Sequence, residues 1–350
     1  MPWRFTGNPR ALAAVQRALA GGSPPHAWLF VGPEGVGKAT LARWLAQAVN
    51  CEERGARSQE PGREVEPCGE CTQCVRIARG IHADVMTVSI LPPEDGVQHK
   101  EISVDQVREV ERAVALAPFE GRTRVVAIDP AEAMSIGAQN AFLKTLEEPP
   151  PNAVFVLIAT GEGGLLPTVR SRCRRIEFGL VPAAEIEQAL VQRGGDAEQA
   201  RLLARLASGR PGRAIEMADN PSRLEKRREV LKQASDLGEM AMGDLMDVSE
   251  RLANRFRDDR QAVLDRLAVW LGYWRDVLLT HSGAEAGIGN VDMLETVRGD
   301  AQRYDAAATL AFVEALLECR RRLEANVQAR IALDALLVHA PRATGRAVAG

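Results

Sequence analysis

The chain has 350 residues, of which 46% are hydrophobic and 26% charged, and its formal net charge is −3 at pH 7. This length exceeds one typical domain, so two or three domains are expected, and the composition is that of a globular protein. The small negative charge excludes a general polyanion binder. Any nucleic-acid contact must then come from a local basic patch or through a partner.

The sequence gives no sign of a membrane segment. Its longest uninterrupted apolar run, residues 153–159, is far too short to cross a bilayer, and the first ten residues lack the apolar core of a signal peptide. We therefore expect a cytoplasmic protein with no membrane contact. Disulfides are rare in the cytoplasm, so clustered cysteines there indicate metal binding.

The first half of the chain alternates between helical and strand patterns. Short apolar runs bounded by turn residues are typical of buried strands, and apolar residues at helical spacing indicate amphipathic helices. The alternation predicts a parallel sheet covered by helices on both faces. Helices are expected at residues 11–20, 37–50, 102–118 and 138–148, and strands at 26–32, 84–90, 123–129 and 152–160.

Beyond about residue 180 the strand signals stop. Short glycine-broken helices are expected over 183–218 and long helices over 224–340. One apolar stripe of a long helix comprises Val263, Leu267, Trp270, Leu271, Trp274 and Leu278. We expect an α/β domain over 1–180, a helical lid over 181–222 and an all-helical domain over 223–345. Residues 52–67 have the composition of a flexible insertion, and the tail from 341 is expected to fray.

Residues 32–40, GPEGVGKAT, follow a predicted strand and open a predicted helix, which is the context of a phosphate-binding loop. Gly32, Gly35 and Gly37 allow backbone N–H groups to turn toward phosphate oxygens, and the helix N-terminus adds its dipole. Lys38 would reach the β- and γ-phosphates. The alternative is a tight glycine turn with no ligand.

The loop lacks the hydroxyl that a P-loop places directly after its lysine to bind Mg²⁺, because Ala39 stands there. Thr40 is one residue further, and one helical residue rotates a side chain by about 100°. Asp129 ends a predicted strand and could hold Mg²⁺ through water, but Pro130 replaces the expected catalytic glutamate. Glu132 is expected to point elsewhere. We therefore expect negligible ATP hydrolysis, whereas residual ATP binding stays open.

Four of the six cysteines fall between residues 51 and 74, with sixteen, two and two residues between them. Three cysteines at i, i+3 and i+6 with one upstream can surround one ion tetrahedrally, which predicts a structural Zn²⁺ site within a module at about 51–80. The alternative is free buried cysteines. The predicted ligands are Cys51, Cys68, Cys71 and Cys74.

Several segments together resemble one family, the AAA+ clamp-loader subunits of bacterial DNA polymerase III. NAFLKTLEEPP and the triplet SRC are its most specific motifs, and the resemblance covers roughly residues 5–340. Within the family, Lys38-Ala39 and Asp129-Pro130 depart from the motor subunits and resemble the delta-prime branch. So does NVQARIALDALLVHA at 326–340, which resembles the end of a helical collar. The motifs are HAWLFVGPEGVGKATLA, CGECTQC, RVVAIDPAEAMSIGAQNAFLKTLEEPP and TVRSRC, in that order.

The resemblance implies an AAA+ P-loop NTPase-like sheet with a zinc-binding insertion, a small helical lid and an all-α collar that takes part in oligomerisation. It further implies a hetero-pentamer with motor (gamma/tau) and delta subunits, which loads a sliding clamp on primer-template DNA. The chain would be a rigid stator without ATPase activity, a non-catalytic subunit of a DNA-directed DNA polymerase holoenzyme. Its SRC triplet would place Arg172 at a neighbour's ATP, just past the last strand of the α/β domain.

Two further positions carry family roles by resemblance. Thr160 resembles the sensor 1 residue, although a hydroxyl that ends a core strand explains it equally. Arg213 resembles the sensor 2 arginine of the lid, although a surface arginine at a helix start is the simpler interpretation. The competing functions are an active motor or repair AAA+ ATPase, which positions 39 and 130 disfavour, and a P-loop kinase, which the helical C-terminal half disfavours.

Overall fold

The computed structural model describes residues 5–21, 24–53, 66–92, 99–325 and 327–342. The chain forms two compact units. The first comprises Met1–Ala189 with Gly209–Arg213, and the second Leu190–Ser208 with Ala214–Gly350. Most of the predicted flexible insertion and the end of the predicted frayed tail lie outside the described residues. The predicted three-domain boundaries stay a prediction. No described helix is long and apolar enough to cross a membrane.

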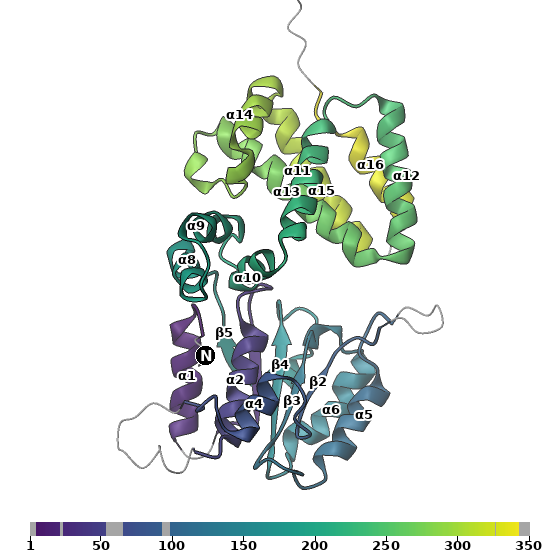
Figure 1. Cartoon of the computed structure of the whole chain (residues 1–350). Helices are drawn as coiled ribbons and strands as arrows, with labels where there is room; N and C mark the ends of the chain where they lie inside the picture. The colour runs from purple at the N-terminus through teal and green to yellow at the C-terminus, as the bar shows by residue number, and fades with distance from the viewer. Residues whose placement is uncertain (1–4, 22–23, 54–65, 93–98, 326, 343–350) are drawn as a thin grey trace, which may run out of the picture. The chain divides into compact units, whose positions relative to one another are not determined.

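The first unit is built on a five-stranded sheet in which every strand pair is parallel (Figure 1). The strand order is β2-β3-β4-β1-β5. The four predicted strands are confirmed, but the sequence pattern missed β5. The bounds are β1 Ala27–Val31, β2 Val85–Val88, β3 Arg124–Ile128, β4 Ala153–Ala159 and β5 Arg174–Glu177.

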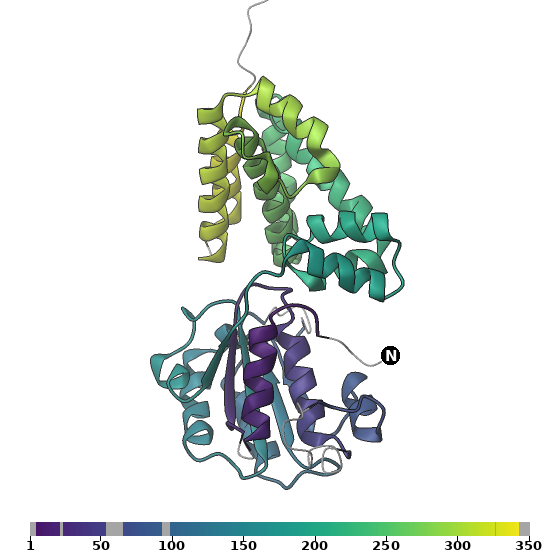
Figure 2. The same ribbon diagram turned by 90° about the vertical axis from the view of Figure 1, so that its left-hand side faces the viewer.

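Helices cover both faces of this sheet (Figures 1 and 2). Trp28 and Phe30 of β1 pack with α1, α2 and α4, whereas Ala27 and Leu29 pack with α5 and α6 on the opposite face. This alternation follows from the two-residue side-chain period of a strand. The predicted helices are confirmed. The bounds are α1 Pro9–Ala20, α2 Lys38–Asn50, α4 Thr72–Ala78, α5 Val104–Val114, α6 Ile136–Glu147 and α7 Pro167–Arg170.

Local capping explains where the helices on this second face begin. Ser103 and Gln106 form a reciprocal capping box at α5, because each side chain accepts from the other residue's backbone N–H. Ser135 caps α6 through the backbone N–H of Ala138. The helix ends at Glu147, shortly before the three prolines at 149–151, as the sequence predicts.

The described residues of the second unit contain helices and no strand, which confirms the predicted all-helical C-terminal region. Its core centres on Trp270, Tyr273 and Trp274 of α13, with Phe312 of α15 stacked edge-on against Trp274. α8 and α10 each contribute residues to both units. The bounds are α8 Ala183–Gln192, α9 Ala197–Leu206, α10 Pro211–Asp219, α11 Pro221–Asp236, α12 Met242–Asp258, α13 Arg260–His281, α14 Leu294–Arg303, α15 Ala306–Glu324 and α16 Ala329–Val338.

Candidate functional site

The predicted phosphate loop connects β1 to α2 at the carboxyl edge of the sheet. Gly32, Gly35 and Gly37 all have positive φ, which explains the glycines. At Gly32 a Cβ atom would lie 2.3 Å from the carbonyl oxygen of Phe178, so no other residue fits there. α2 begins at Lys38 with no side-chain cap, so its first N–H groups face the loop.

Lys38 folds back onto the loop itself. Its Nζ donates to the carbonyl oxygens of Gly32 at 2.5 Å and Pro33 at 2.8 Å, and the residue is only 7% exposed. Burial lowers the pKa of Lys38, against the opposing effect of the Asp129, Glu132 and Glu34 carboxylates. The lysine predicted to meet phosphate is therefore held by carbonyl groups of its own loop.

The metal-binding half of the site is incomplete. Ala39 has no hydroxyl, and among the described residues the Thr40 hydroxyl makes no hydrogen bond with Asp129 or Glu132. Asp129 follows β3 and its backbone N–H donates to Val88. Burial raises the pKa of Asp129, and the nearby Lys38 ammonium opposes that rise.

Glu132 does not point away from this site, and that expectation was wrong. The short turn Ala131–Ala133 carries it toward the end of β4. There its Oε1 accepts from the backbone N–H of Thr160 at 2.9 Å and from the Thr160 hydroxyl at 2.5 Å. The sensor 1 candidate is thus bound by the chain's own carboxylate. Two residues of offset from Asp129 concealed this contact in the sequence.

The loop also contacts the start of α10 and Arg210, the residue directly before that helix. The backbone N–H of Gly212 donates to the carbonyl of Gly35 at 2.9 Å. A Cβ atom on Gly35 would lie 3.3 Å from Arg210 and 3.8 Å from Arg213. Burial and the neighbouring Arg213 lower the pKa of Arg210, whereas Glu34 raises it. The sequence pointed to Arg213 but missed Arg210, whose only signal was its place in the same SGRPGR run.

The SRC triplet lies between α7 and β5, so Arg172 comes before the last strand rather than after it. Its Nη1 donates to the carbonyl of Thr168 at 2.9 Å, and its Nη2 forms an ion pair with Glu147. The side chain is 34% exposed. Arg172 lies on the surface of the first unit, beside the carboxyl end of α6.

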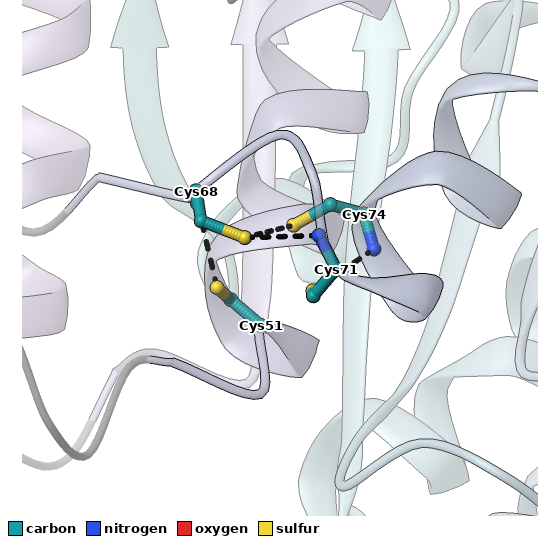
Figure 3. A group of neighbouring side chains, drawn as sticks. All are labelled: Cys51, Cys68, Cys71 and Cys74. Atoms are coloured by element: carbon teal, nitrogen blue, oxygen red, sulfur yellow. Dashed lines mark hydrogen bonds between the residues drawn. The ribbon is translucent and has the colours of Figure 1, made fainter.

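The four predicted cysteine ligands converge (Figure 3). Their sulfur atoms all lie within 4.8 Å of one another, and the Sγ atoms of Cys68 and Cys74 are 3.9 Å apart. Four thiolates at about 2.3 Å from one tetrahedral ion would be about 3.8 Å apart. Cys51 follows α2, and Cys71 and Cys74 lie at the start of α4. This cluster can hold a metal ion.

Backbone donors already point at these sulfurs. The N–H groups of Glu70 and Cys71 donate to Cys68 Sγ, and that of Cys74 donates to Cys71 Sγ. Burial raises the pKa of Cys51 and of Cys74. At Cys68 the burial effect is outweighed by the donated hydrogen bonds, and its pKa is lowered. N–H donors of this kind stabilise a coordinated thiolate.

A buried polar network beside this cluster was not predicted. Asp84 is fully buried and accepts backbone N–H groups from Phe119, Glu120 and Gly121, each at 2.8 Å, together with a guanidinium N–H of Arg124 at 2.9 Å. These donors overcome the effect of burial and hold the pKa of Asp84 at about 2. The network fixes the turn between α5 and β3.

Two neighbours extend the network toward the cysteines. Asn50 Oδ1 accepts the backbone N–H groups of Arg122 and Thr123 at 2.8 and 2.9 Å, directly before Cys51. His82 Nδ1 accepts from the backbone N–H of Asp84, and its Nε2 donates to Gln73 of α4 at 2.5 Å. Burial lowers the pKa of His82, which favours this neutral ring. In the sequence, the only sign of this network was the presence of His82 and Asp84 just before β2.

The parallel sheet, the glycine loop after β1 at its carboxyl edge and Asp129, which follows β3 with β4 between the two strands, define a P-loop NTPase-like fold. Two family models match the chain: "DNA polymerase III, delta subunit" over residues 7–181 and "DNA polymerase III, delta subunit, C terminal" over 221–340. The chain is 33% identical to DNA polymerase III subunit delta′ of Pseudomonas aeruginosa, over 89% of this chain and 90% of that protein. The chain belongs to this delta-prime family of DNA polymerase III clamp-loader proteins.

The chain is also similar to other subunits of DNA polymerase III. Subunit delta′ of Bacillus subtilis is 27% identical over 95% of both chains. Subunit tau of the same organism is 29% identical over 96% of this chain, which spans 61% of the length of tau. A solved gamma subunit-related protein of Thermotoga maritima is 16% identical, covers 94% of this chain and 98% of its own, and superposes with a TM-score of 0.40.

Proposed function

We propose that this protein is the delta-prime stator subunit of a DNA polymerase III clamp loader. In this role it assembles with gamma/tau motor and delta subunits into a hetero-pentamer in the cytoplasm. The complex then loads a sliding clamp on primer-template DNA. Family membership supports the assembly, and the altered nucleotide site supports the stator role. The relative named tau extends well beyond the length that this chain spans, so its wider activities are not carried over.

The observation that carries the stator role is the state of the nucleotide site. Phosphoryl transfer depends on positioned charges and a bound metal ion. Ala39 removes the Mg²⁺ ligand, Pro130 removes the catalytic acid, and Lys38 is bound to carbonyl groups of its own loop. Glu132 occupies the donors of Thr160, where a phosphate would need them free. An active motor subunit, the alternative function, requires a Mg²⁺ ligand, a catalytic acid, and a lysine and a sensor residue that are free to bind phosphate.

The proposed contribution of this chain to catalysis is Arg172. An arginine is always charged and presents several N–H donors in one plane, which suits a group that meets a partner's phosphate. We propose that Arg172 acts in trans on the ATP of a neighbouring motor subunit. A partly exposed position on the surface of the first unit supports this role.

We further propose that the metal in the cysteine cluster is Zn²⁺ with a structural role. Four thiolates leave no open coordination position for a water nucleophile, which is the pattern of structural zinc sites. The ion would tie the end of α2 to the start of α4 across residues 51–74. It supplies no chemistry to the nucleotide site.

The first test measures ATP turnover of the purified chain beside Lys38→Ala. We expect no turnover above that control, because neither the unmodified chain nor the variant can position Mg²⁺ and an attacking water. Co-purification with gamma/tau and delta subunits tests the assembly. Turnover of around 1 s⁻¹ or more, an ordinary enzyme rate, would favour the motor alternative. Failure to co-purify with both subunits would reject the clamp-loader proposal.

A further inference from the structure

Two groups of its own chain hold the guanidinium of Arg172 in place. One is the backbone carbonyl of Thr168 in α7, and the other is the carboxylate of Glu147. Glu147 is the last residue of α6, twenty-five positions before the arginine in sequence. The contact therefore joins two separate elements and is not a local pairing within the SRC turn.

Both anchors are themselves fixed by α6. Phe142 and Leu146 of this helix are buried in the core between the sheet and α5. Gln139, also in α6, donates to the carbonyl of Gly164 at 2.9 Å and accepts from the backbone N–H of Leu166 at 2.7 Å, directly before α7. One rigid helix thus sets the positions of the carboxylate and of the turn that carries the arginine.

The contacts leave donors on Arg172 for a second partner. A guanidinium has five N–H groups. Thr168 and Glu147 each take one, and a longer contact of 3.5 Å joins Nη1 to the Ser171 hydroxyl. At least two N–H groups remain, which is the number that a bidentate phosphate contact needs. Holding by Glu147 and binding to phosphate are therefore compatible.

The neighbouring arginines have other partners, so Glu147 is not a general neutraliser of this basic run. Arg170 pairs with Glu162 at 2.9 Å, and Arg175 pairs with Glu162 and Glu177. Arg174 lies over the ring of Trp28, 5.6 Å from its centre. Among these four described arginines, the one in the SRC triplet is the one that reaches α6.

We propose that Glu147 is a positioning residue for Arg172. Its carboxylate orders the long arginine side chain before the neighbouring subunit arrives, so the guanidinium does not have to be immobilised during the reaction. This inference rests on the proposed role of Arg172 in trans. A displacement of about 1 Å in a reacting arrangement can cost about 100-fold in rate at one site. Loss of Glu147 should therefore act through the arginine and not through folding.

The test compares clamp- and DNA-stimulated ATPase rates of the complete complex carrying Glu147→Ala, Glu147→Gln, Arg172→Ala or the double variant Glu147→Ala with Arg172→Ala. Glu148→Ala is the matched control, because Glu148 is the adjacent exposed acid. We expect Glu147→Ala to remove at least half of the rate that Arg172→Ala removes. Glu147→Gln keeps a hydrogen-bond acceptor and should retain more rate. The double variant should equal Arg172→Ala, since the carboxylate has nothing left to position.

The outcomes separate the two proposals. An unchanged rate for Arg172→Ala would reject the trans role itself. If Arg172→Ala lowers the rate while Glu147→Ala and Glu147→Gln do not, the positioning role is wrong and the trans role stands. A double variant clearly slower than Arg172→Ala would show that Glu147 acts on something other than the arginine. Complex formation by size-exclusion chromatography, measured for each variant, shows whether Glu147→Ala assembles. If Glu147→Ala does not assemble, Glu147→Gln replaces it in the single and double variants. The proposal is then wrong if the double variant loses as much rate as the two single variants together.

Discussion

At the scale of single residues, a buried carboxylate, Asp84, stabilises a turn at the amino end of the sheet. At the carboxyl end, Lys38 and Thr160 of the nucleotide-type site are hydrogen-bonded to other groups of the same chain. Asp84 is fully buried, yet it stays ionised because three backbone N–H groups and Arg124 surround it. A buried carboxylate is tolerated only when its lone pairs are satisfied in this way. Asp84 therefore holds the first part of the turn before β3, residues 119–121.

Replacing Asp84 tests this dependence. A pKa lowered from 3.8 to about 2 corresponds to roughly 2 kcal/mol of stability, at about 1.36 kcal/mol per pKa unit. Asp84→Asn should lower the free energy of unfolding of the first unit by about that amount at pH 7. Urea titrations followed by hydrogen exchange in β1 and β3 measure the effect. Glu109→Gln, at an exposed position of α5, should change stability by less than about 0.5 kcal/mol.

The pH dependence of this difference has a definite sign. Because the folded-state pKa of Asp84 lies below the unfolded value, its contribution is complete above about pH 4 and is lost as the pH falls toward about 2. The gap between wild type and Asp84→Asn should therefore narrow over that interval. A gap that stays constant or widens there would mean that Asp84 acts by shape and not by charge.

Residue identities predicted the missing groups of the nucleotide site better than the contacts that replace them. Ala39 and Pro130 are visible in the sequence because a pattern assigns a chemical group to each position. The contact between Glu132 and Thr160 is not visible, because it depends on how the turn Ala131–Ala133 returns to β4. The ion pair of Arg172 with Glu147 escaped for the same reason, as its partners come from different elements.

At the scale of elements, four strands were predictable because each is an apolar run, and β5 was not. β5 has the sequence RRIE, in which only Ile176 is buried, and it lies at the edge of the sheet. Its pairing with β1 is a tertiary contact that periodicity does not encode. The short helix α4 was also missed, since its seven residues are too few for a repeating apolar pattern to be recognised.

The cysteine cluster offers a prediction at this scale. The purified protein should contain one zinc ion per chain, measured by elemental analysis without chelator. Cys71→Ser should lose the ion, because three thiolates and a hydroxyl bind zinc more weakly, and should increase hydrogen exchange in residues 66–80. Helices α13 and α15 should exchange at the wild-type rate, since they belong to the other unit. Wild-type protein without zinc would contradict the assignment of the metal.

At the scale of the whole molecule, the two units carry different kinds of information. The first unit contains the altered nucleotide site, the cysteine cluster and Arg172, and the second is a helical body with its own aromatic core. Composition and periodicity predicted this division into α/β and all-helical parts. They did not predict that α8 and α10 contribute to both units, because such membership is set by packing.

The last prediction concerns Arg172 in the assembled complex. A trans-acting arginine is worth roughly 10³ to 10⁵ in rate at the single site it serves. Because only one motor site should face this chain, Arg172→Ala should leave assembly intact and remove only part of the clamp- and DNA-stimulated ATPase. Clamp loading should fall further than ATPase, since loading requires the motor sites to act together. Steady-state ATPase and a fluorescent clamp-loading assay on the same preparations measure both effects.

Controls on the isolated chain decide how a loss is interpreted. Arg172→Ala should match wild type in thermal unfolding and zinc content, because its side chain is partly exposed and far in sequence from the cysteine ligands. If the variant complex hydrolyses ATP and loads clamps at the wild-type rate, Arg172 is a surface residue with no trans role. If the complex does not assemble, the arginine is needed for subunit contact. The loss of ATPase activity then comes from failed assembly and not from a missing group at the neighbour's nucleotide. Lower activity in a complete complex is the result that supports a guanidinium acting on a neighbour's nucleotide.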